Sequence, residues 1–279
     1  MAASKDSIDV WAVPPGLRRA YAPCRFGQLH YRIAAPSAPR FPPLLVFHQT
    51  PTSGRCYEGL IGEMGRDRIA IAVDTPGFGA SDPPSHAPSI ADYAGAMGDL
   101  IDALSLPQVD VLGDHTGAKI AVECALQNPE RVRRVVLNAA PVYTAAELDA
   151  LQQQDVAVER FGGDGEHILA RWAWAMHQRG VDTPLDAVLL EVAESLRAGA
   201  HVWHGHHAAF GYQHRDALPR VSQPVLILHA QDDLWAPTAR ARPFIRNGRM
   251  VDLPEWGREM LLVRFQAVAP ILREFLDAD

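Results

Sequence analysis

The chain has 279 residues, of which 48% are apolar and 21% charged, and a formal net charge of −7. A chain of this length is able to bury one large core, and its apolar content excludes an intrinsically disordered protein. The negative charge argues against a nucleic-acid-binding surface. No apolar run reaches the ~18–20 residues of a membrane-spanning helix, so no membrane partner is expected.

The cysteines and the N-terminal residues point to a reduced compartment. Cys24, Cys56 and Cys124 are odd in number and lack the spacing of metal ligands. Residues 1–10 carry charges but no apolar core of a signal peptide. We therefore predict a cytoplasmic protein. The chain has two lysines, Lys5 and Lys119, so Schiff-base chemistry has almost no candidates.

Strand-like and helical patterns alternate along the first part of the chain. Residues 28–33 alternate in polarity like an antiparallel strand, and residues 43–47 and 68–73 are continuous apolar runs typical of buried parallel strands. Ser89 is predicted to cap a helix, because apolar residues recur at helical spacing over residues 90–104.

The same alternation continues to the C-terminal part. Further strands are predicted over residues 109–112, 132–137, 224–229 and 250–253, with a helix over residues 118–126. Strands that alternate with helices in this way predict an α/β protein with a mostly parallel sheet covered by helices on both faces.

Residues 142–220 interrupt the alternation with helical patterns and no convincing strand. Helices are predicted over residues 145–156, 166–178 and 185–196. A helical insertion between sheet strands is expected over the carboxyl ends of the strands, where open α/β sheets bind ligands. We interpret it as a lid that shapes a pocket and restricts water. The predicted parts are an N-terminal core part (1–141), a helical cap (142–220) and a C-terminal core part (221–279).

A glycine-bracketed turn, residues 113–117 with the sequence GDHTG, joins the strand 109–112 to the following helix. A strand, a tight turn and a helix make the nucleophile elbow, in which the pattern G-x-S-x-G is expected. His115 stands at the position of the reactive serine. Because an imidazole titrates near neutral pH, His115 is a candidate base, acid or transient nucleophile. The alternative is a polar residue that fills the pocket or binds the ligand.

Four motifs in this order resemble the α/β-hydrolase superfamily, in the branch with a helical cap after the sixth strand. Residues 48–51 (HQTP) resemble its H-G-x-P oxyanion loop, and residues 74–81 (DTPGFGAS) resemble its D-x-x-G-x-G-x-S loop. The elbow is the third motif, and Asp233 with Pro237 resembles the acid-bearing loop. The resemblance covers residues 28–275 and implies an eight-stranded, mostly parallel sheet.

The resemblance also implies a Ser–acid–His triad, of which two members are replaced. His115 replaces the serine, Asp233 holds the acid position with Asp232 as the alternative, and Arg258 replaces the histidine. No histidine follows His229. Arg258 keeps its proton near neutral pH and is excluded as a general base. It is expected to pair with Asp233 or to bind a substrate carboxylate or enolate-like oxygen.

The oxyanion loop supplies the remaining candidates. The backbone N–H groups of Thr50 and Thr116 are the predicted oxyanion hole, and His48 is expected to support the loop through hydrogen bonds. Gln49 replaces the usual glycine, which leaves the loop conformation open. Asp114 is expected to point away from the reactive centre.

Other polar and aromatic residues have structural interpretations. Cys56 is predicted to be a half-buried structural cysteine. A histidine-rich stretch lacks carboxylates or cysteines at metal-binding spacing, so no metal is predicted, and one or two of its side chains are expected in the pocket. Its members are His201, Trp203, His204, His206, His207, Phe210, Tyr212 and His214. Trp172, Trp174 and Met176 belong to the cap core or to the pocket wall.

These features predict an enzyme with a non-standard centre that acts on a small carbonyl or ester substrate, by hydrolysis with His115 as base or nucleophile. Two alternatives stay open. One is cofactor-free lyase or decarboxylase-type chemistry on a carboxylated substrate, and the other is a non-catalytic ligand-binding protein. The expected partner is a small molecule, no cofactor is predicted, and no oligomeric state follows from the sequence.

Overall fold

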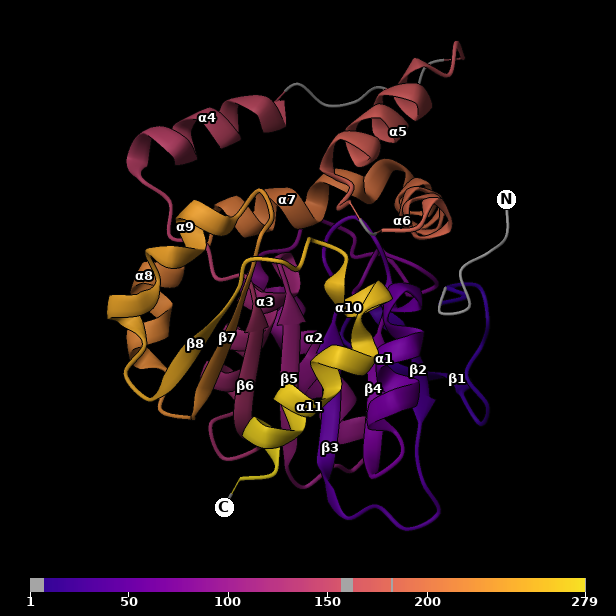
Figure 1. The fold of residues 1–279 in the computed structure, drawn as a ribbon, viewed down its shortest axis with the longest axis vertical. Coiled ribbons are helices and arrows are strands. Elements are labelled where there is room, and N and C mark those ends of the chain that lie inside the picture. Colours follow the sequence, from indigo (N-terminus) through magenta and orange to yellow (C-terminus); the bar gives the residue numbers. More distant parts are fainter. Residues whose placement is uncertain (1–7, 157–162, 182, 279) are drawn as a thin grey trace.

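The computed structural model describes residues 8–156, 163–181 and 183–278 (Figure 1). Its centre is an eight-stranded sheet with the order β1-β2-β4-β3-β5-β6-β7-β8. The strands are β1 (Arg18–Cys24), β2 (Gly27–Ala34), β3 (Phe41–Phe47), β4 (Arg68–Val73), β5 (Val109–Asp114), β6 (Val132–Asn138), β7 (Val225–Ala230) and β8 (Gly248–Leu253). Neighbours from β4 to β8 pair in parallel, whereas β1 and β2 are antiparallel. The predicted fold class is confirmed.

The apolar runs form the central strands because both faces of the sheet are covered. In β3, Leu45 and Phe47 face one hydrophobic cluster, and Leu44 and Val46 face the other. This alternation is the two-residue period of a strand. Each face packs against helices, so the strands need apolar side chains at every position.

The helices include the five predicted over residues 90–104, 118–126, 145–156, 166–178 and 185–196, and, among the described residues, six that the sequence did not predict. They are α1 (Glu58–Met64), α2 (Ile90–Ala103), α3 (Thr116–Gln127), α4 (Ala145–Val156), α5 (Glu166–Gln178), α6 (Leu185–Arg197), α7 (Val202–Phe210), α8 (His214–Ala217), α9 (Trp235–Ala239), α10 (Met260–Val263) and α11 (Phe265–Leu276). Helices α2 and α3 cover one face of the sheet, and α1 and α11 cover the other. None of the described helices is both long and apolar enough to cross a membrane.

Ser89 caps α2 as predicted, in a reciprocal capping box with Asp92. The Ser89 hydroxyl accepts the Asp92 N–H at 3.2 Å, and the Asp92 carboxylate accepts the Ser89 N–H at 2.9 Å. We expect Ser89→Ala to lower the free energy of unfolding by ~1 kcal/mol, measured by urea denaturation. Ser89→Gly is the control and is expected to cost only a few tenths of a kcal/mol, since glycine is a good N-cap residue. Equal losses in both variants would contradict this role of the cap.

Helices α4 to α8 follow β6 and precede β7 in the chain, and α4 to α7 stand over one end of the sheet (Figure 1). The predicted helices 145–156 and 166–178 have the observed bounds, and the third ends one residue later than predicted. Helix α6 holds the loop after β3, because Gln49 donates to Glu191 at 3.0 Å and Ser53 donates to Glu194 at 2.6 Å. The helical segment therefore covers the carboxyl ends of the parallel strands.

Candidate active site

His115 forms the turn between β5 and α3 by itself. Its backbone angles, φ 48° and ψ −104°, lie in a region that side chains with a Cβ rarely adopt. The flanking glycines allow the turn, since a Cβ on Gly113 would lie 2.0 Å from the Gly117 carbonyl oxygen, and one on Gly117 would lie 2.1 Å from that of Phe47. Strained positions of this kind cluster at functional sites. The predicted elbow is formed, and it holds His115 at the base of a pocket.

The pocket has a volume of about 850 Å³ and lies between the sheet and the cap helices. His115, Thr50 and Thr116 lie on the side of the sheet. The aromatic walls come mainly from the cap helices, with Trp174, Trp203, His206 and Phe210 among their residues. This wall suits a small, partly apolar molecule with a few polar groups.

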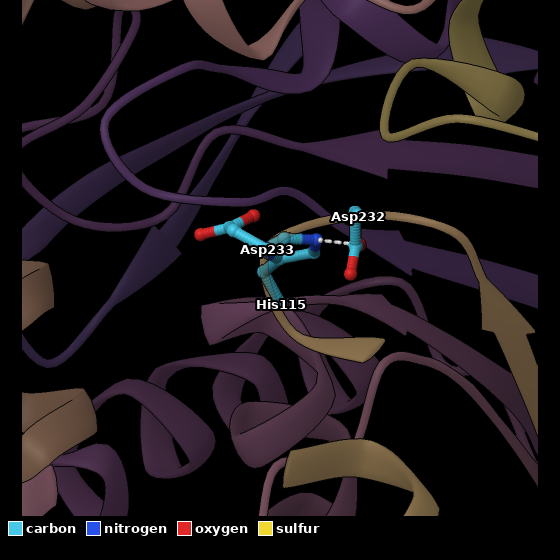
Figure 2. Close-up of side chains that lie close together, drawn as sticks. All are labelled: His115, Asp232 and Asp233. Atoms are coloured by element: carbon cyan, nitrogen blue, oxygen red, sulfur yellow. Dashed lines mark hydrogen bonds and ion pairs between the residues drawn. The ribbon is translucent and has the colours of Figure 1, made fainter. Parts of the chain in front are cut away.

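His115 is hydrogen-bonded to a buried carboxylate. Its Nε2 lies 2.9 Å from Oδ2 of Asp232, in the loop after β7 (Figure 2). Burial alone raises the pKa of Asp232, but the hydrogen bond and charge of His115, with the charge of Arg258, hold it below its usual value. An ionised carboxylate only accepts hydrogen bonds, so Nε2 carries the proton. In the neutral ring, Nδ1 is then the nitrogen that carries the lone pair.

Arg258 faces that second nitrogen. Its Nη1 lies 3.4 Å from Nδ1 of His115 and donates to Asp233 Oδ1 at 2.8 Å, and its Nη2 donates to Gln49 Oε1 at 2.5 Å. The guanidinium is buried and lies 5.2 Å from the centre of the Trp174 ring. Burial lowers the pKa of Arg258, but the surrounding carboxylates raise it above its usual value. A permanent positive charge therefore stands beside His115.

Two opposing influences act on the imidazole of His115. Burial and the charge of Arg258 lower its pKa, whereas the hydrogen bond and charge of Asp232 raise it, and the net shift is upward from 6.5. The neutral form, which accepts a proton, therefore predominates only when the pH exceeds this raised pKa, at a higher pH than for a free histidine.

The two adjacent aspartates have different partners. Asp232, which was the alternative at the predicted acid position, contacts His115. Asp233 forms the expected ion pair with Arg258. The Asp232 carboxylate also accepts the N–H of Leu234 at 2.8 Å, which turns it into the protein. The Asp233 side chain is 39% exposed and lies at the rim. A role for Asp233 as the partner of His115 is not supported by this geometry.

The side chains of His115, Asp232 and Asp233 have ligand atoms within 4.8 Å of one another (Figure 2). This spacing suits a cation, and carboxylate and imidazole groups bind several metals. Arg258, however, already pairs with Asp233 and faces His115. A metal ion there would meet the guanidinium, so the geometry assigns the positive charge of this site to Arg258.

The predicted oxyanion loop is fixed by side-chain contacts. His48 is buried, with its Nδ1 2.8 Å from the Gln49 carbonyl oxygen, and its Nε2 accepts the Thr75 N–H at 3.0 Å. The Gln49 side chain joins Arg258 to Glu191 of α6. Thr50 and Thr116 both line the pocket. The supporting part expected of His48 is observed, and the substitution at Gln49 links this loop to the cap.

Several candidates lie away from the pocket. Asp114 accepts hydrogen bonds from Tyr57 at 2.6 Å and from Asn138 at 2.7 Å, which explains why it points into the protein. Cys56 is 2% exposed, rather than half-buried, and burial raises the pKa of its thiol well above the usual value. A thiol in that state is a poor nucleophile.

The cap residues divide between pocket and core. His206 and Trp203 line the pocket, whereas His214 is buried with its Nδ1 3.3 Å from the Pro141 carbonyl oxygen. Trp174 is a wall residue, and Trp172 and Met176 pack in a small cap cluster around Ala175, Val188 and Val192. Sequence periodicity gave no means of separating these positions.

A sequence model of the alpha/beta hydrolase fold matches residues 42–264. The chain belongs to the α/β-hydrolase family. This hydrolase is 26% identical over 255 residues to a poly(3-hydroxyalkanoate) depolymerase of Ectopseudomonas oleovorans. The aligned region covers 88% of this chain and 87% of the relative. It is 28% identical over 219 residues to a 2-(acetamidomethylene)succinate hydrolase of Mesorhizobium japonicum, with 72% and 77% of the two chains covered.

The solved structures agree with this assignment at the level of the fold. The hydrolase superposes on an esterase from Rhodococcus with a TM-score of 0.78 and 21% identity, over 93% of this chain and 98% of the other. At that identity the likeness shows the fold alone. The two relatives are named as a depolymerase and a hydrolase, and the family is that of the α/β hydrolases, so the enzyme class predicted from the sequence is confirmed.

Sequence reasoning missed Lys119 as a pocket residue. It lies in α3, three residues after Thr116, and both residues line the same pocket. Three-residue spacing on a helix, which places side chains on the same face, was the available signal.

Proposed function

We propose that this hydrolase cleaves small ester substrates with His115 as the general base and Asp232 as the residue that orients it. The observation that carries the proposal is the 2.9 Å hydrogen bond between His115 Nε2 and Asp232 Oδ2 at the elbow. It fixes the tautomer in which Nδ1 accepts a proton. The names of the similar proteins, a depolymerase, a hydrolase and an esterase, support the reaction class.

In the proposed reaction, Nδ1 of His115 takes a proton from a water molecule as the water oxygen attacks the ester carbonyl carbon. The imidazolium that forms is stabilised by Asp232. The tetrahedral oxyanion is stabilised by the backbone N–H groups of Thr50 and Thr116 and by the charge of Arg258. The C–O bond to the alcohol then breaks, and Nδ1 returns its proton to the alkoxide, so the products are an acid and an alcohol.

The geometry gives the alternatives less support. Lyase chemistry with Arg258 as the group that binds the substrate carboxylate gains little support, because its guanidinium already contacts Asp233 and Gln49. A pocket that only binds a ligand does not require the strained backbone of His115 or its buried carboxylate partner. The remaining question within hydrolysis is whether His115 activates water or attacks the ester itself.

The test is turnover of p-nitrophenyl esters of graded chain length by the wild type, Asp232→Asn and Asp233→Asn. We expect Asp232→Asn to lower kcat by about 10²-fold or more, because an asparagine amide favours the tautomer with the proton on Nδ1. Asp233→Asn is the matched control, one residue away and not bonded to His115, and its effect is expected to be smaller. A larger loss in Asp233→Asn, or no wild-type turnover of any ester, would contradict the proposal.

A further inference from the structure

Lys119 places a further positive group in the pocket. Its side chain is 2% exposed, and Nζ donates to the Tyr212 carbonyl oxygen at 2.6 Å. Nζ also lies 5.7 Å from the ring centre of Tyr143 and 5.9 Å from that of Tyr212. Carbonyl oxygens and aromatic faces both attract an ammonium group. The site is therefore built around the end of this lysine and opens on the pocket.

The site lacks the negative charge that a buried ammonium group requires. Across the described residues, Lys119 forms no ion pair with a carboxylate, and burial alone accounts for its pKa of about 7. Arg258, another cation of the same pocket, is paired with Asp233. Buried charges are normally paired, and a lone one loses its charge or acquires a partner from a ligand.

The ionisable groups that face Lys119 do not neutralise it. His214 of α8 adds positive charge when it is protonated, although burial keeps its pKa well below the usual value. Tyr143 and Tyr212 stay neutral, because burial raises the pKa of each phenol.

The nearby carboxylates have other partners. Glu123 of α3 accepts a hydrogen bond from the Tyr212 hydroxyl at 3.1 Å. Glu147, on the pocket wall, pairs with Arg240 at 2.5 Å. The unmatched charge therefore faces the pocket.

We propose that Lys119 is an anion subsite, which binds a carboxylate group on the substrate while the ester of the same molecule lies at His115. The substrate class is then a half-ester of a dicarboxylic acid, or an ester of an aromatic or aliphatic acid with a free carboxylate at its far end. The aromatic wall of the same pocket holds the apolar part of the molecule. The inference rests on the proposed function in treating this pocket as the substrate pocket.

A carboxylate binds the protonated form of Lys119, so its affinity depends on pH. With a folded-state pKa of about 7, Lys119 is charged at pH 6 and mostly neutral at pH 8.5. Carboxylate affinity is therefore greatest at pH 6 and falls as the pH rises. An arginine at this position stays charged throughout and removes this dependence.

The test is calorimetric binding of 4-phenylbutyrate and its neutral amide to the wild type, Lys119→Arg and Lys119→Met. We expect the Kd of 4-phenylbutyrate to rise more than ~10-fold from pH 6 to pH 8.5 in the wild type, while the Kd of the amide stays constant. Lys119→Met is expected to lose the preference for the carboxylate, and Lys119→Arg to keep binding without the pH dependence. His115→Ala separates the two titrating groups, since the pH dependence is expected to persist in it.

Binding is measured without turnover, so the two proposals fail in different ways. Equal Kd values for acid and amide at pH 6, undetectable binding of the acid at pH 6, or an unchanged preference in Lys119→Met would overturn the subsite. A retained carboxylate preference, combined with no ester turnover, would instead overturn the proposed function. Thermal unfolding of each variant confirms that it is folded.

Discussion

His115→Ala is expected to lower kcat for p-nitrophenyl ester hydrolysis by about 10³-fold, because a positioned general base contributes roughly 10²–10⁴-fold to such reactions. The substitution removes the proton acceptor and leaves Asp232 and Arg258 in place. Part of the lost rate is expected to return when free imidazole is added, since the deleted side chain leaves room at the base of a pocket that is open to small molecules. Imidazole should not accelerate the wild type.

The pH profile of the wild type gives an independent readout of the same residue. Because Asp232 keeps the pKa of His115 above 6.5, the rate is expected to rise with pH and to level off above that shifted pKa. The acid limb is expected to move to lower pH in Asp232→Asn, since the group that raises the pKa is weakened. It is expected to be absent in His115→Ala.

Two controls separate the possible mechanisms. Cys56→Ala is expected to hydrolyse the esters at the wild-type rate, because the Cys56 thiol is buried away from the pocket. A burst of p-nitrophenolate equal to the enzyme concentration would identify His115 as a nucleophile that forms an acyl-imidazole, whereas a base gives no burst. Turnover that survives in His115→Ala would refute a catalytic role for this residue.

Much of the scaffold was predictable because its signals are local. The apolar run 68–73 is strand β4, and the helical pattern at 145–156 is α4, each with the predicted bounds. The elbow was predictable for a related reason, since GDHTG contains both glycines that the turn requires. Strand β1 was missed because most of its side chains are exposed at the edge of the sheet, so it lacks an apolar pattern.

The contacts within the site were less predictable because they depend on tertiary structure. Adjacent aspartates look equivalent in a sequence, and a backbone hydrogen bond to Leu234 turns only Asp232 inward. The partnership of Arg258 with Gln49 joins residues that are 209 positions apart. Lys119 was noted only as a rare lysine, because nothing in the helix pattern shows that its neighbours in space lack a free carboxylate.

Arg258→Met is expected to lower the free energy of unfolding by ~3 kcal/mol at pH 8, as is usual when one partner of a buried charge network is removed. Arg258 is the cation shared by Asp233, Glu191, Asp232 and Asp114. Asp233 is partly exposed and regains water, so most of the loss comes from the buried carboxylates. Arg258→Lys keeps the charge and is expected to lose less stability.

The pH dependence of this loss is expected to identify Glu191 as its main source. Burial and the charge of Glu259 raise the pKa of Glu191 to about 7, although Arg258 lowers it. A carboxyl group whose pKa is raised from 4.5 in the folded state stabilises the fold when it is protonated. This contribution is complete below pH 4.5 and is lost as the pH rises through the folded-state pKa. Removing Arg258 raises this pKa further, so the destabilisation of Arg258→Met is expected to be smaller at pH 5.5 than at pH 8.

Urea denaturation of Arg258→Met with and without Glu191→Gln measures this coupling. Glutamine keeps the shape of Glu191 without its charge, so the double variant is expected to recover part of the stability at pH 8 and little at pH 5.5. Equal destabilisation of Arg258→Met at both pH values, or no recovery in the double variant, would show that the lost stability comes from lost packing against Trp174. The burial of Arg258 would then be explained by the shape of its side chain. Recovery would instead show that this hydrolase needs the charge of Arg258 to hold helix α6 over the loop after β3.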